Sequence, residues 1–181
     1  MIFQALDIIR AEVSLGRLNA VLGNIGEILS NSNNVSDSDI IMSLINLEEN
    51  RVSRDPQNYV KEGSEFRLKN PAINLNLSVL FTPYRPEGYG LSIQSLQEVI
   101  EFFQKKHLFD HLNTPDLHPG IEKLILEMVS LNFEQLQQLW SMLGGKYQPS
   151  IIYKIRMVTI DSVSSDGSKP INEIETNYYA K

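Results

Sequence analysis

The clearest pattern of hydrophobic and polar positions runs from Asn132 to Ile160. It starts with apolar residues at helical spacing, which predict an amphipathic helix: Leu136, Leu139, Trp140 and Leu143. Asn132 is suited to cap this helix, with Gln135 reaching back to form a capping box. Gly144-Gly145 predicts its end, because glycine adopts the left-handed conformation past a helix C-terminus without steric cost.

A strand follows Pro149 and is rich in β-branched and aromatic residues. Both faces of residues 151–160 are largely apolar: one carries Ile151, Tyr153, Ile155 and Met157, and the other is apolar apart from Lys154 and Arg156. A strand that is apolar on both faces is predicted to be central in its sheet. The two cations need water or acidic partners, since an unpaired buried charge is costly. We expect them near an interface or a channel.

The rest of the chain alternates between helical and strand-like periods. The predicted elements are a helix over residues 1–22, a short helix or strand at 25–29, strands at 40–47, 73–81 and 121–129, and a helix at 91–108. Residues 51–70 are mostly charged and polar and are predicted to be a long loop. This order predicts an α+β fold, with a mostly antiparallel central sheet flanked by about three helices.

Residues 1–161 are predicted to form one domain, and residues 162–181 a polar C-terminal tail or arm. Two interpretations of that tail stay open. It is either a disordered extension or an arm that orders on a partner by adding a strand to a sheet edge. Only Ile171, Ile174, Tyr178 and Tyr179 offer it apolar contacts.

The composition excludes several classes of function. A net charge of -6 argues against a general nucleic-acid binder, which gains affinity by neutralising phosphates. The N-terminus lacks the pattern of a signal peptide, and no apolar run approaches the roughly 20 residues that span a bilayer. We therefore expect a cytoplasmic protein without membrane insertion. The absence of cysteine removes disulfides, thiolate metal sites and cysteine nucleophiles.

No group of residues makes a strong catalytic or metal motif. The best candidate is a turn that contains His107, Asp110, His111, Asp116 and His118, and two X-Pro steps make a surface turn the favoured interpretation. Glu48-Glu49 with Glu62 and Glu65 is a weaker candidate for acid-base chemistry, because its neighbours are polar. Gly144-Gly145-Lys146 follows a helix, whereas a phosphate-binding loop precedes one. We assign no catalytic residue, metal ligand or cofactor.

Several short segments in a fixed order resemble one known family. They are Ser43 to Arg51, Asn74 to Phe81, Phe102-Phe103-Gln104 with Phe109, and the block Trp140 to Ser150 followed by Tyr153 to Met157. In this order they resemble the N-terminal domain of tail-terminator, or cap, proteins of extracellular contractile injection systems. These are phage-tail-like particles of the antifeeding-prophage and virulence-cassette type.

The resemblance implies a structural protein without enzymatic activity. Such proteins form a six-membered ring that ends the inner tube and anchors the last layer of the contractile sheath. The implied partners are other copies of the chain, the tube protein and the sheath protein, whose arms pair by strand addition. The implied location is the bacterial cytoplasm during assembly and, later, a released particle. The expected interface residues are Glu48, Glu49, Arg51, Lys146, Tyr147, Tyr153, Lys154 and Arg156.

Two alternatives belong to other classes. One is a peptide-binding adaptor that uses a sheet edge, for which a concentration-independent monomer is the distinguishing observation. The other is a hydrolase or metalloprotein built on the histidine turn, which requires bound metal and loss of activity when His107 or His111 is replaced.

Overall fold

The structure is a computed structural model, and it describes most of the chain. The described residues are 1–16, 18–30, 38–50, 59–62, 65–70, 74–84, 88–159 and 162–168. Within residues 59–70, at 159 and in 162–168 the description covers the backbone alone.

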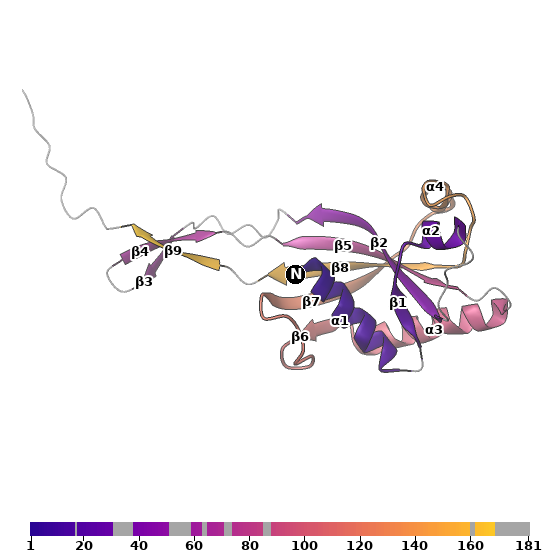
Figure 1. Cartoon of the computed structure of the whole chain (residues 1–181), viewed down its shortest axis with the longest axis horizontal. Helices are drawn as coiled ribbons and strands as arrows, with labels where there is room; N and C mark the ends of the chain where they lie inside the picture. Colours follow the sequence, from indigo (N-terminus) through magenta and orange to yellow (C-terminus); the bar gives the residue numbers. More distant parts are fainter. Residues whose placement is uncertain are drawn as a thin grey trace, which may run out of the picture.

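Four helices and nine strands are described (Figure 1). The helices are α1 (Ile2–Ser14), α2 (Ile25–Ser30), α3 (Tyr89–Lys105) and α4 (Phe133–Met142). The strands are β1 (Ala20–Leu22), β2 (Ile40–Glu49), β3 (Tyr59–Glu62), β4 (Glu65–Asn70), β5 (Leu75–Pro83), β6 (Leu108–Asp110), β7 (Ile121–Val129), β8 (Ile151–Thr159) and β9 (Ser162–Ser168).

The six-stranded main sheet has the order β1-β2-β5-β8-β7-β6. All neighbouring strands in it are antiparallel except β1 and β2, which are parallel. The predicted α+β fold is therefore confirmed, with a mixed sheet. The central place predicted for the strand after Pro149 is also confirmed, because β8 lies between β5 and β7.

The prediction of one helix over residues 1–22 is wrong in its last third. α1 ends at Ser14, and β1 begins at Ala20. The turn between them is held by hydrogen bonds that a continuing helix would not allow. The Ala20 amide donates to Ser14 Oγ at 3.2 Å, and the Asn19 amide donates to Asp39 Oδ2 at 2.8 Å. β1 then pairs with the start of β2, Ala20 opposite Ile40.

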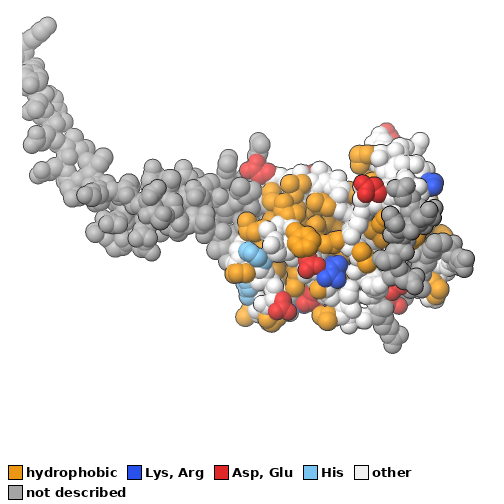
Figure 2. Space-filling model, viewed as in Figure 1, with side chains coloured by type: hydrophobic (Ala, Val, Ile, Leu, Met, Phe, Trp, Pro, Cys, Tyr) orange, Lys and Arg blue, Asp and Glu red, His pale blue; other side chains and the backbone are white. Residues whose placement is uncertain are grey.

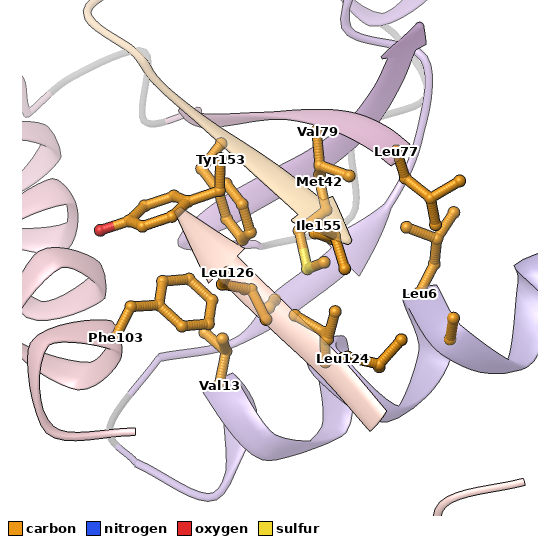
Figure 3. Close-up of a cluster of buried hydrophobic side chains, with 14 of the residues drawn as sticks. Leu6, Val13, Met42, Leu77, Val79, Phe103, Leu124, Leu126, Tyr153 and Ile155 are labelled. Atoms are coloured by element: carbon orange, nitrogen blue, oxygen red, sulfur yellow. The ribbon is translucent and has the colours of Figure 1, made fainter. Parts of the chain in front are cut away.

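One face of the main sheet, which we call face 1, carries the larger core. α1 and α3 cover it (Figure 1), and they contribute Leu6, Ile9, Val99 and Phe103 among others. The centre of this core is aromatic: the ring of Tyr153 lies 4.6 Å from that of Phe103 and 5.7 Å from that of Phe81, centroid to centroid (Figure 3). Burial raises the pKa of the Tyr153 hydroxyl, because the phenolate would lose its hydration.

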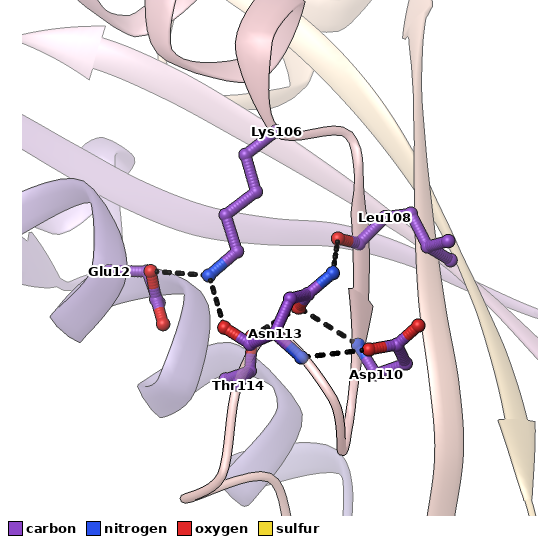
Figure 4. A network of polar contacts seen from close by, with 6 residues as sticks. All are labelled: Glu12, Lys106, Leu108, Asp110, Asn113 and Thr114. Carbon is purple, nitrogen blue, oxygen red and sulfur yellow. Dashed lines mark hydrogen bonds and ion pairs between the residues drawn. The ribbon is translucent and has the colours of Figure 1, made fainter.

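A partly buried ion pair fastens α1 on the same side. Lys106 Nζ lies 2.8 Å from Glu12 Oε2 and donates to the Asn113 carbonyl at 3.1 Å (Figure 4). Both charged side chains are largely shielded from solvent, with 24% and 14% of their surface exposed. Lys106 also lies 4.8 Å above the centre of the Phe109 ring. One cation thus joins α1 to the turn that follows β6.

The opposite face, face 2, carries a smaller core under α2 and α4. Its buried members are Ile25, Ile41, Leu80, Trp140 and Ile152. The predicted capping box of α4 is confirmed: the Gln135 amide donates to Asn132 Oδ1, and the Asn132 amide donates to Gln135 Oε1. The predicted glycine stop is confirmed as well, with φ of 105° at Gly144 and 77° at Gly145.

A second sheet of three strands has the order β3-β4-β9, and all its pairs are antiparallel. It lies past the ends of β5 and β8 (Figure 1). The predicted loop at 51–70 is therefore wrong for residues 59–62 and 65–70, where β3 and β4 pair with each other. β9 falls in the segment predicted as a tail. The division of the chain at residue 161 stays a prediction.

Candidate assembly interface

The uncovered part of face 2 is a row of charged and polar side chains. In the register, Glu48 lies opposite Asn76, Asn76 opposite Arg156, and Ser78 opposite Lys154. Water or acidic partners were the two alternatives for Lys154 and Arg156, and both have an acidic partner. Lys154 Nζ lies 3.6 Å from Glu48 Oε2, and Arg156 Nη2 lies 3.0 Å from Glu127 Oε1. All four side chains in these pairs keep between 37% and 54% of their surface exposed, so the row is open to a partner.

The outer edge of β2 is a second open surface. β1 pairs only with Ile40 to Met42, so from Ser43 to Glu48 the described strands pair with β2 on the β5 side alone. A β-bulge interrupts this stretch between Leu44 and Asn46. Bulges and charged residues are the usual protection of a free edge against uncontrolled strand pairing. The edge is therefore open to strand addition, but the bulge and the charged residues restrict which strands can pair with it.

Apolar side chains accompany that edge on face 1. Leu44 and Leu47 of β2 are exposed by 43% and 46%, and Phe3, near the start of α1, is exposed by 67%. Figure 2 shows hydrophobic side chains gathered beside the start of α1, over β2 and β5. Large exposed apolar side chains near a free edge are typical of a protein–protein contact, because the partner strand then gains burial as well as hydrogen bonds.

A groove follows the length of α4 on face 2. Its wall on the helix side is formed by Gln135, Gln138, Leu139 and Met142, and its floor crosses the four central strands through Ile45, Ser78, Ile152 and Val129. The groove has a volume of about 340 Å³. Its length, its open top and its largely apolar lining suit an elongated partner segment rather than a small ligand.

The helix that forms this wall is held rigidly. α2 approaches it so closely that a Cβ on Gly26 would lie 2.9 Å from the Leu143 carbonyl oxygen, so only glycine fits there. Lys146 Nζ donates to the Leu29 carbonyl at 3.0 Å, and the Ser43 hydroxyl donates to the Gly23 carbonyl and accepts from the Ile25 amide. α2 and α4 therefore form one platform over β2.

The expected interface residues fall in different environments. Glu48, Lys154 and Arg156 lie together in the open row of face 2, and Glu49 follows at the exposed end of β2. Lys146 joins the segment after α4 to α2, and Tyr147 is 59% exposed, with its ring and that of Trp140 in a T-shaped contact. Tyr153 lies in the core and is only 4% exposed. Arg51 lies outside the described residues. The role of the exposed members at an interface stays a prediction.

The histidine turn has structural uses for its polar groups. His111 Nε2 is 2.8 Å from the Ile121 carbonyl, His118 Nδ1 accepts from the Gly120 amide, and Asp110 Oδ1 accepts from the amides of Leu112 and Asn113. Within the described residues, no group of three or more histidine, aspartate or glutamate side chains is placed to hold a metal ion. Glu62 and Glu65 face each other across β3 and β4, but their side chains lie outside the described set.

The sequence predictions did not include the open edge of β2 or the groove along α4. The edge of β2 is open because β1 is short, and the sequence of residues 20–22 does not show where the pairing of β1 with β2 stops. A weak signal for the groove was present: Met142 lies on the apolar side of α4, but it is 70% exposed. In the described part of the chain, no helix is both long and apolar enough to cross a membrane.

Comparisons with known proteins identify the fold. The model of the Pvc16 N-terminal domain family matches residues 7–173. The structure is similar to the PVC sheath/tube terminator in its extended state, from an extracellular contractile injection system, with a TM-score of 0.61 and 16% identity. That match covers all of this chain and 64% of the terminator chain. A search of curated proteins found no match.

A second similar structure is the tube-terminating cap of the anti-feeding prophage. Its TM-score is 0.51 at 17% identity, and the match covers 76% of this chain and 48% of the cap chain. The chain thus spans about half to two thirds of the length of these two neighbours. The resemblance inferred from the sequence is confirmed by the family model, with the two structures supporting the fold, and the chain belongs to the Pvc16 N-terminal domain family.

Proposed function

We propose that this chain is a structural terminator of a contractile injection system. In this role copies of the chain form a ring of six, which ends the inner tube and anchors the last layer of the sheath. The similarity over the whole chain to a solved sheath/tube terminator is the observation that carries the proposal. The ring is assembled in the bacterial cytoplasm and leaves the cell as part of the particle.

The open surfaces fit such a role. A closed ring requires two unlike surfaces on each subunit, because each copy contacts its neighbours head to tail. The charged row of face 2 and the apolar surroundings of the β2 edge are unlike in this sense. The edge also offers a sheath or tube arm a place to add a strand, because between Ser43 and Glu48 every other residue of β2 turns its backbone groups away from β5, where no described strand pairs with them. Contacts through these surfaces need no catalytic residue.

Light scattering of the purified chain, alone and with its tube protein, tests this proposal. We expect a mass close to six times 20.6 kDa, formed either by the chain itself or only when the tube protein is present. Glu134→Gln, on the solvent side of α4, serves as a control that leaves assembly intact. A monomer that ignores tube and sheath proteins at high concentration would contradict the proposal.

The free edge of β2 also favours a second candidate function. A peptide-binding adaptor would use the same edge to bind an extended segment by strand addition. Such a protein would stay monomeric at every concentration and bind single peptides in a one-to-one ratio. The light-scattering experiment therefore separates the two functions.

A further inference from the structure

The open edge of β2 presents its backbone groups in a fixed pattern. Opposite residues of an antiparallel pair alternate between exchanging both backbone hydrogen bonds and exchanging none. Met42 lies opposite Phe81, and its carbonyl accepts from the residue that follows β1, so its backbone groups turn away from β5 (Figure 1). Leu44 and Leu47 lie opposite the second and fourth residues before Phe81. They therefore turn their backbone groups outward as well, and a strand added at this edge would bond there.

The side chain of Asn46 already occupies part of this edge. Its Oδ1 accepts from the Leu47 amide at 2.9 Å, so the amide proton that an added strand would need is bonded within the chain. Its Nδ2 donates to Glu48 Oε1 at 3.0 Å, and the other oxygen of Glu48 lies 3.6 Å from Lys154 Nζ. The Asn46 amide is thus held at both ends. Its oxygen accepts as the main-chain carbonyl of a neighbouring strand would.

The β-bulge places Asn46 for this contact. Because Ile45 is the extra residue, the side chains of both Ile45 and Asn46 lie on face 2, where they line the groove along α4. Asn46 therefore shares face 2 with Glu48, its hydrogen-bond partner. Leu47, between them, lies opposite Leu77 of the larger core and belongs to face 1.

The side chains at the edge describe the strand that fits it. Leu44 and Leu47 lie on face 1 and are 43% and 46% exposed. An added strand places every second side chain on that face, so apolar residues at these positions gain burial against both leucines. A strand that offers backbone bonds alone only exchanges one hydrogen bond at Leu47 for another, and gains little. The edge therefore fits an extended segment with apolar residues at alternate positions.

The symmetry of a ring argues against a second β2 edge as the occupant. Two copies that paired through the same edge would be related by a two-fold axis, and such a contact closes a dimer. A ring of six built from head-to-tail contacts leaves this edge for a segment of a different protein.

We propose that Asn46 is a latch on the β2 edge, which an extended segment of a different protein displaces when it adds as a strand. A main-chain carbonyl of the segment takes the place of Asn46 Oδ1 on the Leu47 amide, and its alternate apolar side chains cover Leu44 and Leu47. The inference rests on the proposed function and names the residue that selects the partner at its open edge.

Asn46→Ala in the full-length chain tests the latch, because it leaves the Leu47 amide to water. Binding is titrated with the tube protein and the sheath protein separately, which shows which of them supplies the segment. We expect the Kd for that protein to fall roughly two- to tenfold, the change that the loss of one competing hydrogen bond gives. The matched control is Gln97→Ala on α3, which removes another exposed amide that donates to a carboxylate, Glu101 Oε1 at 2.7 Å. It should leave the Kd unchanged.

Amide hydrogen exchange at Leu47, measured by NMR, is a second readout that does not depend on the size of the affinity change. In the free chain the Leu47 amide should exchange several-fold faster in Asn46→Ala than in the wild type. In the complex it should be protected equally in both, because the same carbonyl of the added strand then accepts from it.

The outcomes separate the two proposals. Equal or weaker binding by Asn46→Ala, or a Leu47 amide that stays unprotected in the complex, overturns the latch and leaves the terminator proposal standing. Stronger self-association of Asn46→Ala without tighter binding to either protein also overturns it, because the occupant would then be a second copy. If neither protein binds either form of the chain, both proposals fail.

Discussion

The two faces of the main sheet differ in how completely they are covered. Face 1 lies under α1 and α3, and its core contains Phe81, Phe103, Phe109 and Tyr153. Among the described residues, α2 and α4 alone cover face 2, and beyond Ser78 it carries paired charges. We propose a division of roles: face 1 supplies most of the folding free energy, and the open part of face 2 with the adjoining β2 edge serves assembly.

Two isoleucines on opposite faces of β8 give the strongest test of this division. Ile155 points into face 1 and is fully buried, and Ile152 points into face 2 at the groove. Replacing Ile155 by alanine should lower the free energy of unfolding by about 4 kcal/mol, and Ile152→Ala by about 2.5 kcal/mol, because the groove side leaves a smaller enclosed cavity. Urea denaturation measures both. Equal losses would show that the faces are equally packed.

The ion pair under face 1 should give the next largest effect. Glu12→Gln removes the charge that faces Lys106, leaving a mostly buried ammonium group with one carbonyl partner. We expect a loss of about 2 kcal/mol in the free energy of unfolding, from breaking a partly buried pair. A loss in the free energy of unfolding smaller than that of a solvent-exposed ion pair would show that water reaches Lys106.

The matched ion pair on face 2 should matter much less to folding. Glu127→Gln breaks the bond to Arg156, but both side chains are about half exposed. We expect a loss of about 0.5 kcal/mol, typical of a solvent-exposed pair. If the row serves assembly, the same variant should weaken ring formation more than it weakens the fold, and comparing denaturation with light scattering separates the two.

Tyr153→Phe should have the smallest effect at neutral pH, since it keeps the ring between Phe81 and Phe103. The folded pKa of Tyr153 is raised by burial, so the unfolded chain releases its proton first as the pH rises. The wild-type protein therefore loses stability above the ordinary tyrosine pKa of about 10, and the loss continues until the folded pKa is passed. The phenylalanine variant should lose less over that range. Parallel pH titrations of thermal unfolding measure the difference.

Sequence periodicity predicted the elements that bury one clear face. The helix from Asn132 and the strand after Pro149 were predicted with their cap and their stop, and acidic partners were one of the two alternatives for Lys154 and Arg156. Leu136, Leu139, Trp140 and Leu143 alone were enough to orient α4, because each of them packs on face 2.

The sequence predictions missed elements that do not bury a clear apolar stripe, because periodicity detects only such a stripe. β1 and β6 have three residues each, too few to show a period, and β3 and β4 contain several polar residues. Met128 and Ile93 fit apolar patterns but are exposed by 50% and 42%, because hydrophobic spacing does not show where a neighbouring element ends. The candidate interface depends on where neighbouring elements end. The sequence therefore indicated the interface residues on β8, but not the open edge of β2 or the groove along α4.

Hydrogen–deuterium exchange on the chain alone and in the assembled state tests the division between the faces most directly. It reports on both faces in one experiment. We expect slower exchange on assembly in residues 43–48 of β2 and 135–142 of α4, with α1 and α3 unchanged. Slower exchange confined to α1 and α3 would contradict it, because the assembly surface would then be the covered face.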